Sequence, residues 1–451
     1  MRSIGATAGL SLDAGAAADK AALFAAATKA LDAIADSTTN REDPPSLFWV
    51  PGRIEFLGKH TDYAGGRSLL CAVDRGICLA TRSRRDARVR VHDAQRGEMV
   101  ETAIDESVAQ DVSGWAIYPS VVARRLARNF PGARIGADIA FASDLPIAAG
   151  ISSSSALVVS IFLALSTVNS LDERDDYREV VQSIDDLAGY LGAIENGLEF
   201  GSLAVHGGVG TLGGCEDQTA ILCGRRDALI QYSFCPVRLE DVVPIPPGHR
   251  FVVAASGVAA EKTGSALQRY NLLSRRAQAA AAAWRASSGL SHATLGEAVR
   301  GASPDVIRAA LMVRAPAGFT VPELLERFEQ FYLESEVLVP RTADALRRHD
   351  LPQLGALVDQ SQAAAERLLG NQIAETIMLA RTARELGAVA ASAFGAGFGG
   401  SVWALVDERH LTAFLDEWRE RYRRAFPAHG AVAQFFGTRA GSCAARLAGG
   451  G

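Results

Sequence analysis

Residues 144–156, DLPIAAGISSSSA, constrain the fold of this chain more than any other part of its sequence. Before this segment, apolar side chains alternate over residues 135–141, which is typical of a strand. After it, residues 157–165 are apolar on nearly every side, which is typical of a buried helix. The sequence therefore predicts a strand, a Gly/Ala/Ser loop and a helix, in that order.

Four serines fall where this helix begins, and that position favours an anion site. The first turn of a helix carries backbone N–H groups without intrahelical partners, and the helix dipole is positive there. Gly150 permits a positive φ and a close approach by a phosphate, and a serine hydroxyl there can reach a magnesium ion held by that phosphate. The alternative is that the serines only cap a core helix. The segment is not a Walker loop, because no Gly-Lys-Ser/Thr follows.

Composition excludes several classes of protein. The 451 residues are 48% apolar, which allows a large core and two or three domains. A net charge of −5 without a long basic run argues against nucleic acid as a partner. No apolar run is long enough to span a bilayer, and no signal-peptide pattern opens the chain. The six cysteines form no CxxC pair, so we expect reduced thiols and a cytoplasmic protein.

A second segment, residues 51–66, places charged side chains between glycines after an expected strand over residues 47–50. Arg53, His60 and Asp62 are among them. Such density in a loop is more typical of a binding site than of a solvated turn, although a surface loop with scattered charge stays an alternative. No third metal ligand is near the His and the Asp, so a metal site is not expected here.

These segments resemble motifs of one enzyme family. Residues 52–63, GRIEFLGKHTDY, are similar to the galactokinase signature GRxNxIGEHTDY. Residues 146–156 resemble the motif PxGxGLSSSA of the small-molecule kinases for galactose, homoserine, mevalonate and phosphomevalonate. Residues 392–401, SAFGAGFGGS, resemble the Gly-rich third motif of that family, and we place them between a helix and a strand. The three motifs occur in the family's order.

The resemblance implies an α+β fold with two lobes and an active site in the cleft between them. We expect an N-terminal lobe over residues 1–240 and a C-terminal lobe over residues 241–451. It implies a kinase that uses ATP and Mg²⁺ to phosphorylate the anomeric hydroxyl of galactose or a galactose-like sugar. The expected partners are the sugar and ATP, with no nucleic acid and no membrane, and the chain is expected to be a monomer or a weak homodimer.

The resemblance also implies roles for individual residues. The catalytic pair would be Asp217, from the stretch GCEDQ, and Arg53. The residues that would bind the sugar are Lys59, His60, Asp62, Gly214 and Tyr270. The residues that would bind the ATP phosphates are Ala148, Gly150, Ser152, Ser153, Ser154 and Ser155. The magnesium ligands would be Ser154 and Glu195.

Two of these assignments rest on altered spacing. Glu195 lies further ahead of Asp217 than the family's spacing, so Glu199 is an alternative ligand. A Gly-rich insertion near residues 201–210 accounts for the difference and could form a flap over the site. Tyr270 belongs to a Tyr-Asn motif in which two extra residues precede the Arg-Arg pair.

Other departures leave alternatives open. Lys59 stands where galactokinases carry a Glu directed at the C6 hydroxyl, which suggests a substrate with a C6 carboxylate such as galacturonate. We favour the alternative that this lysine turns to solvent or pairs with Glu55 or Glu216. Ala148 replaces a Gly and Ser155 an Ala, which opens the possibility of a sugar and ATP sensor that does not catalyse. A mevalonate-type acceptor is disfavoured by residues 60–63.

Overall fold

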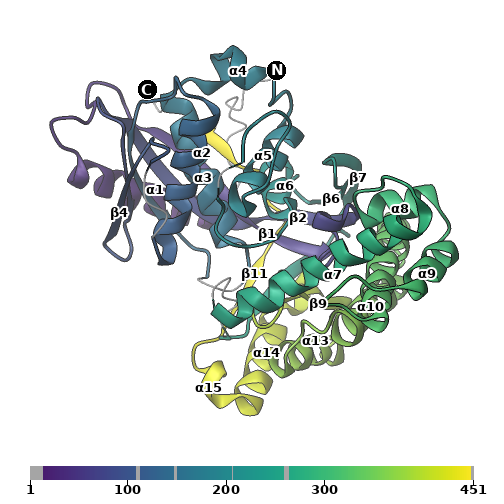
Figure 1. Cartoon of the computed structure of the whole chain (residues 1–451). Helices are drawn as coiled ribbons and strands as arrows, with labels where there is room; N and C mark the ends of the chain where they lie inside the picture. Colours follow the sequence, from purple (N-terminus) through teal and green to yellow (C-terminus); the bar gives the residue numbers. More distant parts are fainter. Residues whose placement is uncertain (1–13, 108–111, 147–149, 206, 259–263, 448–451) are drawn as a thin grey trace.

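The structure is a computed structural model that describes residues 14–107, 112–146, 150–205, 207–258 and 264–447. Ala148 lies outside the described residues. Helices and strands occur in both halves, as an α+β fold requires. Helices α7–α10 lie on the side of the molecule away from α1 and β4 (Figure 1).

The first sheet has eight strands in the order β12-β1-β2-β5-β3-β4, and β6 and β7 extend it from β2. Among the described strands of this sheet, only β3 and β5 pair in parallel. β12, from the far end of the sequence, pairs with β1. The strands are β1 (Ser46–Leu57), β2 (Arg67–Ser83), β3 (Arg88–Asp93), β4 (Glu98–Ala103), β5 (Ala137–Ser143), β6 (Ala228–Ser233), β7 (Arg238–Pro244) and β12 (Ala445–Leu447).

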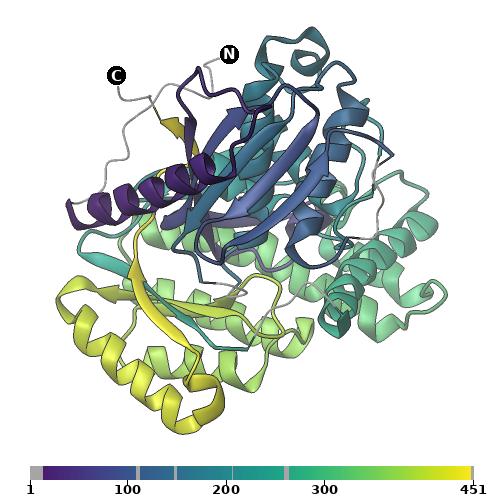
Figure 2. The same cartoon turned by 90° about the vertical axis from the view of Figure 1, so that its left-hand side faces the viewer.

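Helices cover both faces of this sheet because successive side chains of a strand point to opposite faces. Ala80 packs against α1, whereas its neighbour Leu79 belongs to the core that includes α3. Figure 2 shows α1 lying across the sheet. The helices of this half are α1 (Ala14–Ile34), α2 (Ile117–Asn129), α3 (Ser153–Val168), α4 (Asp175–Arg178), α5 (Ile184–Asn196) and α6 (Glu216–Cys223).

The second sheet has four antiparallel strands in the order β11-β8-β10-β9. They are β8 (His249–Ala255), β9 (Ala390–Phe394), β10 (Ser401–Asp407) and β11 (Gln434–Thr438). The remaining helices are α7 (Gly264–Ser288), α8 (Leu295–Gly301), α9 (Pro304–Val313), α10 (Val321–Tyr332), α11 (Val339–Arg347), α12 (Leu351–Ala364), α13 (Ala374–Glu385), α14 (Leu411–Ala425) and α15 (Pro427–Gly430).

The strand and helix expected around the serine segment are confirmed as β5 and α3. Two expectations about motif placement are wrong. Residues 51–57 continue β1 and are not a loop, and register shifts at Pro51/Arg53 and Glu55/Leu57 let the strand bend there. The third motif joins β9 to β10, so two strands flank it and not a helix and a strand.

Three aromatic side chains join the two sheets. Phe56 of β1 stacks on Trp403 of β10 with ring centroids 4.2 Å apart, and Phe251 of β8 meets both rings edge-on. Trp403 is fully buried. This contact holds the strand that carries the first motif against the sheet that carries the third.

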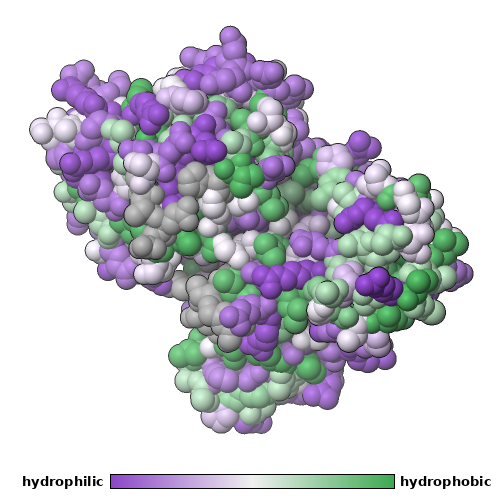
Figure 3. All heavy atoms as spheres, viewed as in Figure 1, coloured by the Kyte–Doolittle hydropathy of each residue, from purple (hydrophilic) through white to green (hydrophobic). Residues whose placement is uncertain are grey.

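No helix among the described residues combines the length and the apolar character that crossing a membrane requires. On the face shown in Figure 3, hydrophobic residues lie in small groups between hydrophilic ones. The first sheet includes β7, which ends at Pro244, and takes in β12, so a division into lobes near residue 240 stays a prediction.

Replacing Trp403 with Ala is expected to lower the free energy of unfolding by about 3–5 kcal/mol, because it leaves a cavity between the sheets. Chemical denaturation checks this. Trp115→Ala is the matched control, since Trp115 is only partly buried and should cost less. An equal loss in both variants would contradict a special role for the contact between the sheets.

Candidate active site

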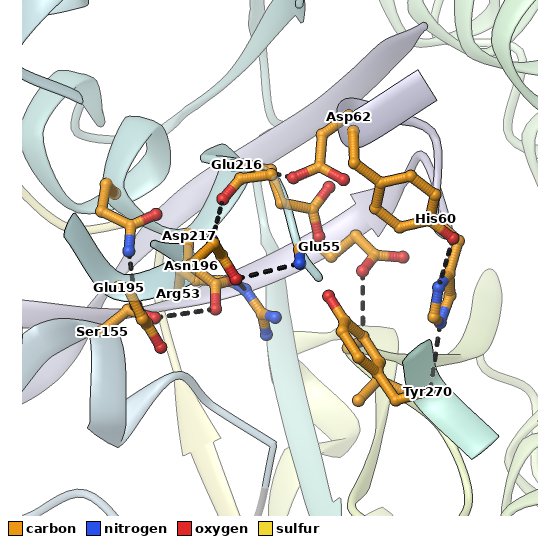
Figure 4. A pocket seen from close by; sticks show the side chains of 16 residues that line it. Arg53, Glu55, His60, Asp62, Ser155, Glu195, Asn196, Glu216, Asp217 and Tyr270 are labelled. Atoms are coloured by element: carbon orange, nitrogen blue, oxygen red, sulfur yellow. Dashed lines mark hydrogen bonds and ion pairs between the residues drawn. The ribbon is translucent and has the colours of Figure 1, made fainter. Parts of the chain in front are cut away.

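One pocket is lined by residues from all three motifs (Figure 4). It lies where β1, the first turns of α3 and α6, the end of α5, α7 and the β9–β10 loop meet. Its lining residues are Arg53, Glu55, His60, Asp62, Tyr63, Ser155, Glu195, Asn196, Gly213, Gly214, Glu216, Asp217, Gln218, Tyr270, Gly395 and Ala396.

The loop before α3 has the geometry of an anion site. Gly150 has φ 72° and Ser152 has φ 58°, so both lie in the left-handed region. Ser152 is buried, and its Oγ has no hydrogen-bond partner among the described residues. Ser153 and Ser154 are partly buried on the first turn of the helix. A buried hydroxyl without a partner beside a helix N-terminus suits a phosphate.

Arg53 connects this loop to Asp217. Its Nε lies 2.7 Å from Asp217 Oδ1, and its Nη1 donates to the carbonyl oxygen of Gly150 over 2.6 Å. Burial alone would lower the pKa of Arg53, but the carboxylates of Asp217, Glu216 and Glu55 outweigh it and raise the pKa. The guanidinium therefore stays charged at the centre of the site.

Asp217 is the second residue of α6, and its side chain is 14% exposed. The Ser155 hydroxyl donates to Asp217 Oδ2 over 3.0 Å. The structure therefore directs Ser155, which was expected at the phosphates, to this carboxylate. Arg53 and Ser155 thus donate to different oxygens of the Asp217 carboxylate, and the group lines the pocket.

The first motif supplies the opposite wall of the pocket. His60 Nδ1 lies 2.9 Å from the Tyr63 hydroxyl, and His60 Nε2 lies 3.1 Å from the carbonyl oxygen of Ala396. Burial, followed by the charge of Arg327, lowers the pKa of His60 to about 3, so its ring is neutral. The His60 ring also lies 5.3 Å from the Tyr270 ring.

Asp62 and Gly214 meet on the same wall. Asp62 Oδ2 accepts a hydrogen bond of 3.1 Å from the backbone N–H of Glu216. A Cβ at Gly214 would collide with the Asp62 carboxylate. Only glycine therefore allows this approach between the first motif and the segment that leads to Asp217.

The pocket contains Glu195 and not Glu199. Glu195 is 2% exposed, and its Oε2 accepts a hydrogen bond of 2.6 Å from Gln218 Nε2. Glu199 lies beyond the end of α5 and is exposed. The inserted segment lies close to this helix end, since the backbone N–H of Val209 donates to the carbonyl oxygen of Glu195 over 2.8 Å.

Lys59 is not among the residues that line the pocket. It is 1% exposed, and its Nζ donates to Ser361 Oγ over 2.8 Å and lies 3.9 Å from Glu334 Oε1. That carboxylate also accepts a hydrogen bond from Ser361 and one from the backbone N–H of Gly58. The pairing expected for this lysine is confirmed, but the partner is Glu334 and neither Glu55 nor Glu216. Sequence separation hid this partner, which belongs to the π-helical segment Leu333–Leu338 that follows α10.

Glu55 and Glu216 form a pair of neighbouring carboxyl groups in the wall of the pocket. Burial, followed by the neighbouring charge of Glu55, raises the pKa of Glu216 well above its usual value. Burial, opposed by the charges of Lys59 and Arg53, raises the pKa of Glu55 to about 7. Glu55 Oε2 also accepts a hydrogen bond of 3.1 Å from Gly395 N–H. The sequence carried one signal for this pair, since Glu55 stands where the galactokinase signature has Asn.

The arrangement suits phosphoryl transfer to a hydroxyl group. A buried arginine and an oriented carboxylate line one pocket, and the arginine also donates to Gly150 of the candidate phosphate site. No cluster of three His, Cys, Asp or Glu side chains that could hold a metal occurs in the described part of the chain. Glu195 and a serine of the first α3 turn offer oxygen ligands, which fits an ion that binds few protein groups and several phosphate oxygens.

Comparison with known proteins agrees with this geometry. Residues 37–83 match the galactokinase galactose-binding signature, residues 117–225 the GHMP kinases N terminal domain, and residues 342–424 the GHMP kinases C terminal domain. A galactokinase of Chloroflexus aggregans is 30% identical over 384 residues, covering 82% of this chain and 86% of that protein. A galactokinase of Roseiflexus is 28% identical over 386 residues, covering 85% and 88%.

Solved structures agree on the fold. The galactokinase of Lactococcus lactis, crystallised with galactose, superposes with a TM-score of 0.72 at 24% identity and covers 94% of this chain and 99% of its own. A mevalonate kinase superposes with a TM-score of 0.55 at 13% identity, covering 88% and 99%. Three family motifs meet in one pocket, and the Chloroflexus aggregans galactokinase is 30% identical over 82% of the chain. The chain therefore belongs to the galactokinase family of the GHMP kinases.

Proposed function

We propose that this chain transfers the γ-phosphoryl group of ATP to the anomeric hydroxyl of galactose or a galactose-like sugar. The observation that carries the proposal is the Asp217 carboxylate, held by Arg53, in the pocket that the first α3 turn also lines. Relatives named galactokinase along most of the chain support the same activity. An intact set of these residues favours an enzyme over a sensor that does not catalyse.

In the proposed reaction the sugar hydroxyl oxygen attacks the γ-phosphorus, the bond between that phosphorus and the β–γ bridging oxygen breaks, and ADP leaves. Asp217 orients the hydroxyl and takes its proton as the new bond forms. Arg53 keeps this carboxylate ionised and helps to neutralise charge that develops on the transferring group. The backbone N–H groups at the start of α3, with Gly150, Ser152 and Ser153, hold the phosphates.

Magnesium would be held by Ser154 and Glu195 together with phosphate oxygens. When bound, the ion supplies charge neutralisation on the phosphates. Glu195 suits this role because it is buried in the pocket and fixed by Gln218. The choice of Glu195 over Glu199 rests on that placement.

The charges of the pocket favour a neutral sugar over a uronate. Its lining includes five carboxylate residues, and Arg53, its cation among the described residues, is paired with Asp217. His60 is neutral, and Lys59 is directed at Glu334. A sugar carboxylate would therefore enter a pocket without an available cation. Asp62, His60, Gly214 and Tyr270 are the proposed sugar contacts.

We further propose that the chain works in the cytoplasm, as a monomer or weak homodimer with lobes that divide near residue 240. All six cysteines are free, which suits a reducing compartment.

Replacing Asp217 with Asn is expected to lower kcat for galactose phosphorylation about 10²–10⁴-fold, because the amide cannot take the proton. ADP release with MgATP and a sugar panel measures this. The control is Asp359→Asn, which alters a partly exposed carboxylate paired with Arg384 at the surface. Sugar binding by the wild-type protein without any turnover would contradict the proposed activity and favour the sensor.

Lys59→Met is expected to leave the ratio of kcat/KM for galactose and galacturonate within about twofold of wild type, since the lysine does not line the pocket. It should lower the free energy of unfolding by about 3–5 kcal/mol, because Glu334 loses its buried partner. The double variant Lys59→Met with Glu334→Gln should recover part of that loss. A large change in the sugar ratio would show that Lys59 sets specificity after all.

The variant Glu55→Gln tests the raised pKa of Glu55 through the pH dependence of stability. The folded pKa of Glu55, about 7, is higher than the roughly 4.3 of an unfolded chain, so the folded state binds more protons between these values. Its stability therefore falls as the pH rises through that window. The Tm of the variant minus the Tm of the wild type should therefore rise by about 1–3 °C from pH 5 to pH 8, because only the wild type loses stability over this range. A constant difference, as expected for the surface control Glu101→Gln, would contradict the raised pKa.

A further inference from the structure

Ser155 is the residue of the α3 start whose contacts differ from its expected role. It is the third residue of the helix, and its side chain is 1% exposed. Its hydroxyl donates to the proposed catalytic base over 3.0 Å, in a pocket that both residues line. The motif it belongs to usually ends in Ala at this position, which has no hydroxyl to donate.

This hydrogen bond is the last of a chain of hydrogen bonds that runs from Gly150 through Arg53 and Asp217 to Ser155. The carbonyl of Gly150 accepts from Arg53, Arg53 also donates to Asp217 Oδ1, and Ser155 donates to Asp217 Oδ2. Gly150 and Ser155 stand on either side of the loop and first helical turn that would hold the phosphates. Without the Ser155 hydroxyl, this hydrogen bond between α3 and α6 is lost.

Two donors on one carboxylate restrict its orientation. The terminal torsion of an Asp side chain is broad and roughly twofold, so hydrogen bonds to both oxygens restrict its rotation more than a bond to one oxygen does. Arg53 and Ser155 hold different oxygens, and this fixes the plane of the group. Hydrogen bonds to an ionised acceptor are the stronger kind, so the restraint is effective.

We propose that Ser155 is a positioning residue that holds the Asp217 carboxylate at a fixed orientation relative to the phosphate site, and that it is not a ligand of the ATP phosphates. The inference rests on the proposed kinase activity. Its consequence is mechanical: the helix that would hold the phosphoryl donor also orients the base for the acceptor. Misorientation of the base affects the chemical step and leaves the binding of both substrates intact.

The test is the steady-state kinetics of Ser155→Ala and Ser155→Thr with galactose and MgATP. We expect kcat to fall about tenfold in Ser155→Ala, with KM for ATP and for sugar within twofold of wild type. Ser155→Thr keeps the hydroxyl and should restore most of kcat. Ser160→Ala is the matched control, because Ser160 is a fully buried serine of the same helix outside the pocket and should leave kcat unchanged.

Each other result has a distinct meaning. A higher KM for ATP with an unchanged kcat would make Ser155 a phosphate ligand and overturn the inference. Unchanged kinetics in Ser155→Ala, or an equal loss in Ser155→Thr, would also overturn it, since the hydroxyl would then not matter. A wild-type protein that turns over no sugar would instead refute the proposed function, and the inference would fall with it.

Discussion

The ion pair between Arg53 and Asp217 is the interaction on which the rest of the site depends. It joins β1 to α6, with Arg53 Nε 2.7 Å from Asp217 Oδ1. Arg53 also donates to the carbonyl oxygen of Gly150 and so holds the loop before α3. A buried arginine of this kind stabilises only when its partners are in place, because an uncompensated buried charge is costly. The pocket is therefore a unit in which three segments distant in sequence hold one another.

Buried charge is organised in two layers around this pair. In the wall of the pocket, burial raises the pKa of both Glu55 and Glu216, so the two groups carry less negative charge than two free carboxylates. Lys59, Glu334 and Ser361, none of which lines the pocket, form a second buried network. The lysine therefore has a partner within the protein, and its charge is compatible with the neutral sugar proposed as substrate.

Local sequence patterns predicted much of the fold and the membership of the site. The strand and helix around the serine segment follow from patterns within short windows. The meeting of Arg53, Asp62, Asp217 and Tyr270 in one pocket was implied by the resemblance to the kinase family. What could not be predicted depends on contacts between distant segments: the extension of β1 through two register shifts, the Glu334 partner of Lys59, and the direction of the Ser155 hydroxyl. A side chain at a helix start can turn to a ligand or to a neighbouring helix, and only the packing decides.

The pairing of β12 with β1 has a consequence for synthesis on the ribosome. On the side of β1 away from β2, the strand partners of residues 47–49 are Ala445–Leu447. The edge of the first sheet beside β1 lacks this partner until residues 445–447 have been translated. The pocket also needs Gly395 and Ala396 of the β9–β10 loop, so its lining is incomplete until these residues have been synthesised. Binding of nucleotide or sugar would therefore begin only late, and ligands could stabilise the finished protein but not its early folding intermediates.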